Sequence, residues 1–481
     1  MPNAPFYVLD CGATCKSRTV DPPAKLAFTP LARFNARSSP NLCNVATGHQ
    51  KGCSNQSSGG VEVFKQTDPK QQVRYAEAAR LSAYWFLQNQ NTPSQPWGGV
   101  YNSADEGRFL YEYYPTTGWS RGMGVWGQTL GIFSLLALRE TGIDLSVQAQ
   151  GVAGACLLGA IRAARYMMTL QILDTRDERR VGAFREHNPQ ANFSFPRDAA
   201  TGAFGLLALY RLTHEQEYLD RVRMFCKWYM TYGSDKQGWP VVTFPFTTCQ
   251  PKDQQLAGLW QVGGGLAYYY LSELTGEKEW VEQGLRPIVE RALTMFDDSD
   301  QANGKGGMAD LHGLHGNDDF ATVTMLAAYR AFGEKKYLDR FARNVSMLMA
   351  CRHADGSFRN FAGCFMAGLT MLDALRLGDE LPKSLDRKAV AEAVARAADF
   401  GLTVQETQLR DPRAFGGMYG QSMYQVARDR IHQRSTGYAS VLYSRLVAPQ
   451  PLPYFSALSW SRLETPVDVG WAEQQDLSEA F

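Results

Sequence analysis

The pattern of apolar and polar residues changes near residues 65–72. From Pro69 onward, apolar residues recur with helical spacing in long amphipathic stretches, which are divided by loops rich in glycine and aromatic residues. Residues 1–68 lack this period and hold six Pro, four Cys and short β-like stretches between turn residues. We therefore expect an irregular or β-containing segment at 1–68, a helical domain at 69–450 and a C-terminal tail at 451–481.

The helical part repeats one sequence motif. Each copy begins with small and apolar residues and continues with Leu or Tyr, then Thr or Gly, a charged pair, and Tyr-Leu or Trp-Val. The clearest copies begin at 202, 263 and 319, so their starts differ by 61 and 56 residues. Two helices and two loops account for a period of this length.

Turns that combine glycine with aromatic or apolar residues follow the same spacing and predict six helical hairpins. In each hairpin an apolar helix lies inside and a mixed helix, such as 217–230, lies outside. We expect these hairpins to close into an (α/α)6 toroid, an all-α fold with a funnel at one end. A linear tetratricopeptide array is disfavoured because its period is about 34 residues. The turns lie at 97–99, 182–184, 238–240, 306–308, 356–358 and 415–417.

Charge and composition argue against some classes of function and favour others. The 49 basic and 48 acidic side chains leave a net charge of +1, which argues against a nucleic-acid binder and against a polybasic membrane-surface protein. Aromatic residues make up 12%, which suits a cleft that stacks on sugar faces. No segment reads as a signal peptide or a membrane span. We expect a cytoplasmic protein, or an exported one if a leader has been removed.

The first cluster of candidate residues spans 105–124. It gathers acids, tyrosines including Tyr114, Trp119 and Arg121 ahead of an apolar helix. An arginine beside aromatic rings can bind a carboxylate in bidentate fashion while a sugar ring stacks. Gly122 and Gly124 allow close backbone approach to a ligand. The alternative is a loop that seals the toroid, with Arg121 paired to a nearby acid.

The second cluster lies at 182–202, immediately before a predicted inner helix. It contains Glu186, His187, Arg197 and Asp198. Asp198 lies near the helix start, where the helix dipole favours an ionised carboxylate, so it is either a helix cap or an acid/base group. Glu186 and His187 can titrate near neutral pH if they are partly buried.

The third cluster, at 308–320, contains His312, His315, Asp310, Asp318 and Asp319. Histidine and carboxylate side chains suit zinc or manganese, but the intervening glycines do not form a helical ligand pair. We therefore prefer a general acid/base pair in a glycan cleft. Structural hydrogen bonding is the remaining alternative.

The fourth cluster, at 413–438, includes Tyr419, Tyr424, His432, Arg434 and Tyr438. Tyrosine beside Arg or His is what proton abstraction next to a carboxylate needs in lyases and epimerases. Packing where the ring closes explains the tyrosines equally well.

The N-terminal segment contains four cysteines, Cys11, Cys15, Cys43 and Cys53, with His49 among them. Four thiols of this kind can hold a structural zinc ion in a segment with little apolar core. Disulfides in an exported protein and unpaired thiols are the alternatives.

Over residues 70–445, the sequence resembles the six-hairpin glycosidases and related polysaccharide-active enzymes. The nearest likeness is to unsaturated glucuronyl and galacturonyl hydrolases: residues 119–124 (WSRGMG) are similar to their W-x-R-G-x-G loop, which contacts the uronate. Residues 197–204, followed by LALYRLT, are similar to their acid-bearing helix start. The resemblance implies that Asp198 is the general acid/base and that Trp119 and Arg121 hold the sugar. Residues 111–117 (YEYYPTT) are also similar, more faintly, to uronosyl C5-epimerases.

We therefore expect an enzyme that acts on an acidic, uronate-containing saccharide by glycoside hydrolysis or by hydration of an unsaturated uronyl ring. It should need no cofactor for catalysis and bind neither nucleic acid nor membrane. The rivals are a lyase or C5-epimerase that uses Tyr419 or Tyr114 with His312, and a non-enzymatic scaffold that binds a protein in the ring. A terpenoid-cyclase-like toroid is disfavoured because there is no DDxxD or DxDD run. The expected catalytic residues are Asp198, Glu186, His312, Asp318 and Tyr419, and the expected substrate-binding residues are Trp119, Arg121, Arg197, His187, Trp239, Tyr114 and Arg434.

Overall fold

The computed structural model describes residues 68–93, 103–122, 124–143, 152–252, 258–302, 320–350, 352–357, 361–420, 429–467 and 469. The chain divides into two units, Met1–Asn55 and Gln56–Phe481, and all described residues belong to the second. No helix among them is both long and apolar enough to cross a membrane. The division at residues 68 and 450 stays a prediction.

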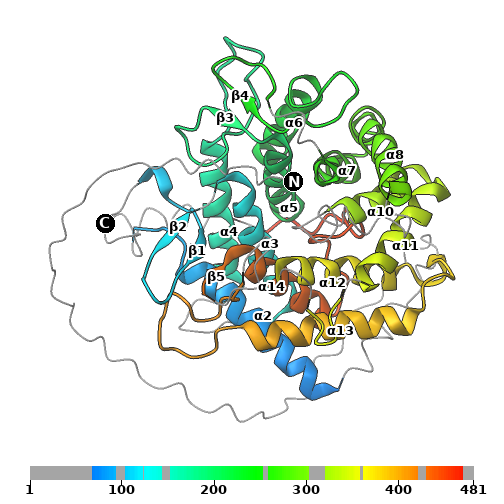
Figure 1. Cartoon of the computed structure of the whole chain (residues 1–481). Coiled ribbons are helices and arrows are strands. Elements are labelled where there is room, and N and C mark those ends of the chain that lie inside the picture. Colours follow the sequence, from blue (N-terminus) through cyan, green and yellow to red (C-terminus); the bar gives the residue numbers. More distant parts are fainter. Residues whose placement is uncertain are drawn as a thin grey trace, which may run out of the picture. The chain divides into compact units, whose positions relative to one another are not determined.

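Twelve α-helices in the described residues alternate between an outer and an inner ring (Figure 1). Buried side chains cover nearly all of the inner helices, whereas an outer helix such as α6 is buried along one face only. The expected hairpins, with apolar helices inside and mixed helices outside, are therefore confirmed. The outer helices are α2 (Pro69–Gln88), α4 (Val152–Thr169), α6 (Gln216–Thr231), α8 (Arg286–Ala302), α11 (Lys335–Ala350) and α13 (Arg387–Val404). The inner helices are α3 (Val125–Thr141), α5 (Pro196–Thr213), α7 (Leu266–Thr275), α10 (Ala321–Phe332), α12 (Phe361–Arg376) and α14 (Gln433–Val447).

The last hairpin packs against the first and closes the ring. Helix α14 lies against both α2 and α3, while α3, α5, α7 and α10 pack in succession along the inner ring. A closed ring buries the end faces that a linear array of hairpins would expose. The fold is the expected (α/α)6 toroid.

Glycines in the left-handed conformation turn the chain between an outer helix and the next inner helix. At Gly182, Gly356 and Gly416, a Cβ would lie 2.5, 2.4 and 2.1 Å from a backbone oxygen of a neighbouring outer helix. For Gly416 that oxygen belongs to Leu81 of α2. The last hairpin therefore contacts the first through the same glycine-to-carbonyl approach that Gly182 and Gly356 make to the next outer helix. Only glycine fits such a contact at positive φ. The expected turns at 97–99 and 306–308 lie outside the described residues.

Residues 452–460 fill the end of the ring at which the inner helices finish. Trp460 stacks on Tyr270 of α7, with ring centroids 3.9 Å apart. Asp373 of α12 forms a buried ion pair with Arg445 of α14 and accepts a hydrogen bond from the Ser456 hydroxyl at 2.7 Å. Because a buried charge is costly unless it is paired and hydrogen-bonded, these contacts fix the tail in place.

Short strands shape the other end. An antiparallel sheet in the order β2–β1–β5 joins the first hairpin to the last and is called the closing sheet below. A second pair, β3 with β4, lines the loop before α5. The strands are β1 (Leu110–Tyr113), β2 (Ser120–Gly122), β3 (Phe193–Ser194), β4 (Phe244–Pro245) and β5 (Ile431–His432).

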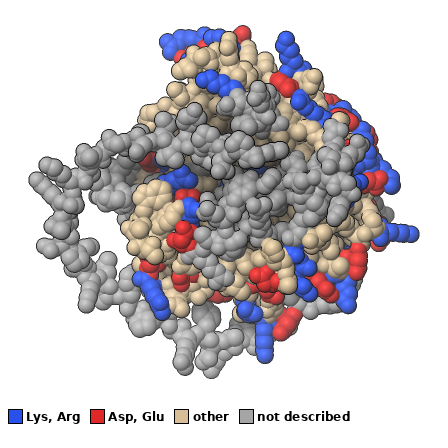
Figure 2. Space-filling model, in the orientation of Figure 1, with Lys and Arg blue, Asp and Glu red and all other residues tan. Residues whose placement is uncertain are grey.

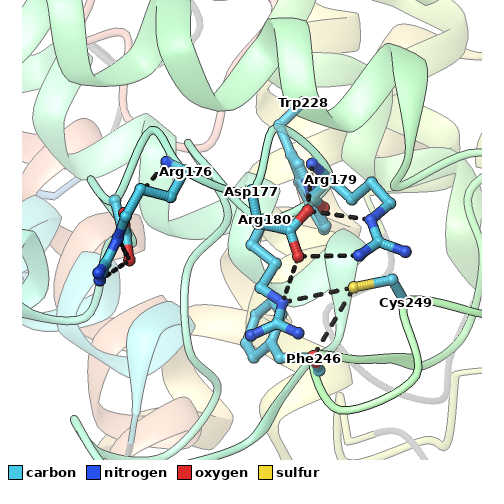
Figure 3. A network of polar contacts seen from close by, with 8 residues as sticks. Arg176, Asp177, Arg179, Arg180, Trp228, Phe246 and Cys249 are labelled. Carbon is cyan, nitrogen blue, oxygen red and sulfur yellow. Dashed lines mark hydrogen bonds and ion pairs between the residues drawn. The ribbon is translucent and has the colours of Figure 1, made fainter.

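A polar network holds the loop between α4 and β3 (Figure 3). The Asp177 carboxylate pairs with Arg179 at 2.9 Å and with Arg180 at 3.0 Å. Arg180 Nε also donates to Cys249 Sγ at 3.4 Å, and Trp228 Nε1 of α6 donates to the Arg179 carbonyl at 2.8 Å. Three segments that are distant in sequence are thereby fixed around the chain that leads to Glu186.

Charges on the outer surface are mixed. Basic and acidic side chains are interspersed on the face drawn in Figure 2. Several form pairs one helical turn apart, such as Arg286 with Glu282 and Lys335 with Asp339. Exposed pairs of this kind contribute at most about 1 kcal/mol each, so the packed rings carry the stability.

Candidate active site

The loops that carry the predicted site residues lead into inner helices and therefore lie at the end of the ring where the inner helices begin. Asp198 is in the first turn of α5, Trp126 is the second residue of α3, and Arg434 is the second residue of α14. Helix N-termini carry partial positive charge, so this end of the inner ring favours anionic groups.

Two carboxyl groups lie near each other at the start of α5. Glu186 is fully buried, and burial, followed by the charge of nearby Asp198, raises its pKa well above the ordinary value. Asp198 accepts a hydrogen bond from Arg197 Nη1 at 3.0 Å. Arg197 itself is buried, donates to the Trp260 carbonyl at 3.2 Å and lies over the Phe320 ring. A carboxyl group that favours its protonated form therefore stands beside a carboxylate that is paired with a guanidinium.

The backbone of Glu186 is hydrogen-bonded, but one oxygen of the Glu186 carboxyl group has no hydrogen-bond partner among the described residues. Glu186 Oε2 accepts from the Phe195 N–H at 3.4 Å, whereas the buried Oε1 has no hydrogen-bond partner among the described residues. The Glu186 carbonyl accepts from the Val125 N–H at 3.0 Å, where α3 begins. A Cβ on Gly124 would lie 1.5 Å from that carbonyl oxygen. Gly124 thus permits close approach to the protein's own backbone, rather than to a ligand as expected.

Further buried polar atoms near the helix starts have no partner within the described part of the chain. Among them are Nε1 of Trp126 in α3 and Oε1 of Gln261, which precedes α7. A buried polar group without a partner costs about 1–3 kcal/mol. A polar molecule bound at this end of the ring can recover such bonds.

A second charged cluster is centred on Glu112 in the closing sheet. Glu112 is 4% exposed, and its Oε1 lies 3.3 Å from Arg121 Nη2, 3.3 Å from Arg430 Nη1 and 3.5 Å from His432 Nε2. Burial by itself would raise the pKa of Glu112, but His432 and the two arginines outweigh it and lower that pKa to about 2. Glu112 is therefore a fixed negative charge and not a proton donor.

His432 is the neutral member of this cluster. Its Nδ1 accepts from the Arg434 backbone N–H at 3.1 Å at the start of α14, so the ring proton belongs on Nε2, which faces Glu112. Complete burial lowers the pKa of His432 to about 4, although the Glu112 charge acts in the opposite direction. The imidazole is uncharged at neutral pH.

Aromatic rings support the arginines of the cluster. Trp119, on the loop between β1 and β2, is 51% exposed and meets Tyr114 edge to face at 5.3 Å. Its ring offers an exposed aromatic surface beside the closing sheet. The guanidinium-to-centroid distances are 4.8 Å for Arg121 over Tyr111, 5.1 Å for Arg430 over Tyr114 and 4.1 Å for Arg434 over Trp126.

The structure brings eight of the predicted catalytic and substrate-binding residues into these two clusters. Arg434 belongs to both clusters. It lies two residues after His432, and its positive charge acts to lower the pKa of Glu186. His187 follows Glu186, and its ring lies edge-on to Phe193 at 5.5 Å. Glu186, His187, Arg197 and Asp198 belong to the loop and helix start at α5, and Tyr114, Trp119, Arg121 and Arg434 surround the closing sheet.

Two more predicted residues have other side-chain contacts. Tyr419 lies beside the closing sheet, because its backbone bridges Ile431 of β5. Its hydroxyl donates to Glu406 at 2.8 Å, and burial, together with Glu406, raises the pKa of Tyr419 to about 12. Trp239 is fully buried, with the Arg291 guanidinium over its ring, and so has no exposed face on which a sugar can stack. His312, Asp318, Cys11, Cys15, Cys43 and Cys53 lie outside the described residues, so their roles stay predictions.

The partnership of Glu112, Arg430 and His432 was not predicted from the sequence. All three lay within candidate clusters, and His432 was named in the fourth, but nothing local indicated that the three side chains would meet. Arg430 is 318 positions from Glu112 and follows no motif. The partnership becomes visible only from the pairing of β1 with β5.

Sequence comparison identifies no relatives. No family model matches the chain, and no curated protein matches it.

Solved structures do match. Cellobiose 2-epimerase from Bacillus thermoamylovorans is 12% identical, with a TM-score of 0.53, and the match covers 75% of this chain and 95% of that one. A family 76 α-mannanase from Bacteroides thetaiotaomicron is 13% identical, with a TM-score of 0.53 and coverage of 81% and 98%. An unsaturated glucuronyl hydrolase specific for heparin is 10% identical, with a TM-score of 0.50 and coverage of 78% and 97%. At such low identity these likenesses establish the fold alone. The chain has the six-hairpin (α/α)6 toroid that these carbohydrate-active enzymes share.

Proposed function

We propose that this chain is an enzyme that acts on an acidic, uronate-containing saccharide and that Glu186 is its proton donor. One observation carries the proposal. Glu186 is a fully buried carboxyl group with a raised pKa and an unpartnered oxygen, and it stands beside Asp198, which is paired with Arg197. Pairs of carboxyl groups whose surroundings differ in this way perform acid/base catalysis in glycan hydrolysis.

The proposed reaction adds one water molecule. In glycoside hydrolysis, the Glu186 carboxyl group donates its proton to the glycosidic oxygen as the bond from that oxygen to the anomeric carbon breaks. Water attacks the anomeric carbon, and Asp198 accepts the proton that the water loses. In hydration of an unsaturated uronyl ring, the same two groups donate a proton to the double bond and accept one from the water.

The surrounding residues suit an acidic sugar. Arg121, Arg197 and Arg434 offer positive charge, and the exposed face of Trp119 offers a platform for a sugar ring. His187 lies next to the proposed donor in sequence. His312 and Asp318 remain part of the proposal as supporting groups.

A lyase or C5-epimerase that uses a tyrosine base ranks second. Such a base must reach the phenolate form, but burial raises the pKa of Tyr419 to about 12, and burial also raises that of Tyr114. Both hydroxyls already contact charged side chains, Glu406 and Arg430 respectively. These surroundings favour the carboxyl pair over a tyrosine base.

The test is a panel of acidic polysaccharides and oligosaccharides analysed by mass spectrometry. Hydrolysis adds one water for each bond cut, whereas elimination adds none and produces an ultraviolet-absorbing double bond. Glu186→Gln and Asp198→Asn should each lower turnover about 100-fold or more. Glu273→Gln is the matched control, because burial also raises the pKa of Glu273, which lies in the last turns of α7. Wild-type turnover in Glu186→Gln would refute the proposal.

A further inference from the structure

The tail at 452–460 supplies a buried aromatic ring to the interior of the toroid. Phe455 is 1% exposed, and its ring centroid lies 4.7 Å from that of Phe133 in α3 and 4.9 Å from that of Tyr438 in α14. It also stacks on Phe320, with centroids 5.7 Å apart and planes 9° apart. Phe320 directly precedes α10, so the tail contacts the end of the ring at which the inner helices begin.

The backbone at Phe455 is held in a conformation that is unfavourable for any residue with a Cβ. Its φ is +51°, in the left-handed region that bulky residues seldom adopt. The Arg445 guanidinium donates to the Phe455 carbonyl at 3.3 Å. Asp373, the ion-pair partner of Arg445, accepts from the Ala457 N–H at 3.0 Å on the other side of the bend. Because such strain persists only where surrounding contacts impose it, this buried ion pair holds the bend that places the Phe455 ring.

Phe320 connects the tail to the candidate acid/base pair. The Arg197 guanidinium lies over the Phe320 ring, 5.1 Å from its centroid, and donates to Asp198 at 3.0 Å. A Cβ on Gly263 would lie 2.8 Å from the Phe320 Cβ and 3.4 Å from Arg197 Nη2, so glycine leaves room for both side chains. An aromatic ring against a guanidinium fixes the plane of its N–H groups. The Phe320 ring therefore sets the direction from which Arg197 meets Asp198.

We infer that Phe455 is a positioning residue of the candidate active site: it holds the Phe320 ring and, through that ring, the guanidinium that pairs with Asp198. This inference rests on the proposed function, in which Asp198 accepts a proton from water. Phe455 is fully buried, so it acts on the chemical step and not by contact with the saccharide. The tail is then a part of the catalytic apparatus as well as of the core.

The first test is steady-state kinetics of the full chain on the saccharide that the mass-spectrometric panel identifies. Phe455→Leu should lower kcat about 10-fold or more and change KM less than about threefold, because a displaced acid/base group slows the chemical step. Phe455→Tyr keeps the ring and should retain more activity than Phe455→Leu. Trp460→Leu is the matched control and should keep the wild-type kcat, since Trp460 is an equally buried ring of the tail that stacks on Tyr270 and not on Phe320.

A double-mutant cycle separates positioning from a loss of packing. If Phe455 acts through Arg197, adding Phe455→Leu to Arg197→Lys should lower kcat little further, whereas independent effects would multiply. Should Phe455→Leu fail to fold, Phe320→Leu takes its place in the cycle, because it removes the middle of the same series of contacts.

A second readout needs no substrate. The charge of Arg197 acts to lower the pKa of Glu186, and so does that of Arg434. Burial and the charge of Asp198 raise the same pKa. If Phe455→Leu releases Arg197, the pKa of Glu186 in the folded protein should rise further. The pH at which the stability difference between Glu186→Gln and its parent levels off should then be higher in the Phe455→Leu background than in wild type.

Four results would overturn the inference: a wild-type kcat in Phe455→Leu, an equal loss of kcat in Trp460→Leu, losses that multiply in the cycle, or an unchanged pH at which the stability difference levels off. The proposed function fails separately, if Glu186→Gln retains turnover. Should Glu186→Gln lose its activity while Phe455→Leu keeps it, the proton donor stands and the positioning role is wrong.

Discussion

Replacing Glu186 with glutamine should lower turnover about 100-fold or more and at the same time stabilise the fold at neutral pH. The folded protein holds the Glu186 proton more tightly than the unfolded chain does, because burial raises the pKa of this carboxyl group well above 4.5. Between those two pKa values, unfolding releases a proton, so the free energy of unfolding falls as the pH rises. Glutamine has no proton to lose and escapes this penalty.

The size of the effect follows from linkage. One proton changes the free energy of unfolding by at most about 1.4 kcal/mol per pH unit. The difference between Glu186→Gln and wild type should therefore be flat below pH 4.5, rise with up to this slope above it, and level off at the folded pKa. The other titrating groups are common to both proteins and cancel in the difference.

The measurement is urea unfolding of both proteins at a series of pH values, with the m-value monitored for two-state behaviour. Glu217→Gln is the control, because Glu217 is exposed on α6 and pairs with Arg221 at 2.8 Å. Its difference from wild type should stay within about 0.5 kcal/mol. A pH-independent difference for Glu186→Gln would show that Glu186 is ionised in the fold and would refute our assignment of the proton donor.

Three further predictions test the fold. Burial lowers the pKa of His432 from 6.5 to about 4, so the unfolded chain takes up a proton here at a higher pH than the folded protein does. Wild type should therefore lose about 3 kcal/mol of stability from this group as the pH falls from 6.5 to 4, and acid titration of His432→Asn should lack that loss. Gly416→Ala, whose Cβ would meet the Leu81 carbonyl, should cost about 3 kcal/mol or more in denaturant unfolding. Gly142→Ala, at similar φ but in open space, should cost only about 1 kcal/mol, and equal costs would contradict the role of the turn. His214→Gly should raise the midpoint of thermal unfolding, with a gain of about 1 kcal/mol, because His214 ends α5 in the left-handed conformation that Gly276 and Gly333 adopt elsewhere.

The fold was predictable because its signals are local and repeated. A 3.6-residue period identifies each helix, and a glycine in a recurring position identifies the turn that follows an outer helix, as at Gly182 and Gly416. The same logic places Glu186 and Asp198, since both precede or open an inner helix. Local signals of this kind can be recognised in a single sequence, because they depend only on residues that are close along the chain.

The partnership of Glu112 with Arg430 was not predictable from such signals. It depends on the register between strands of four and two residues that lie more than 300 positions apart, and strands this short carry no periodicity. The exposure of an aromatic residue is equally hidden. Trp119 and Trp239 both lie in glycine-containing loops, yet one is half exposed and the other is covered by Arg291.

Closure of the ring by α14 has a consequence for synthesis on the ribosome. Helix α3 ends at Thr141, and its partner α14 begins at Gln433, nearly 300 residues later. At about 5–20 residues per second, the first hairpin waits on the order of tens of seconds for the helix that covers its apolar side. Newly made chain of this topology should therefore depend on chaperones until translation is nearly complete.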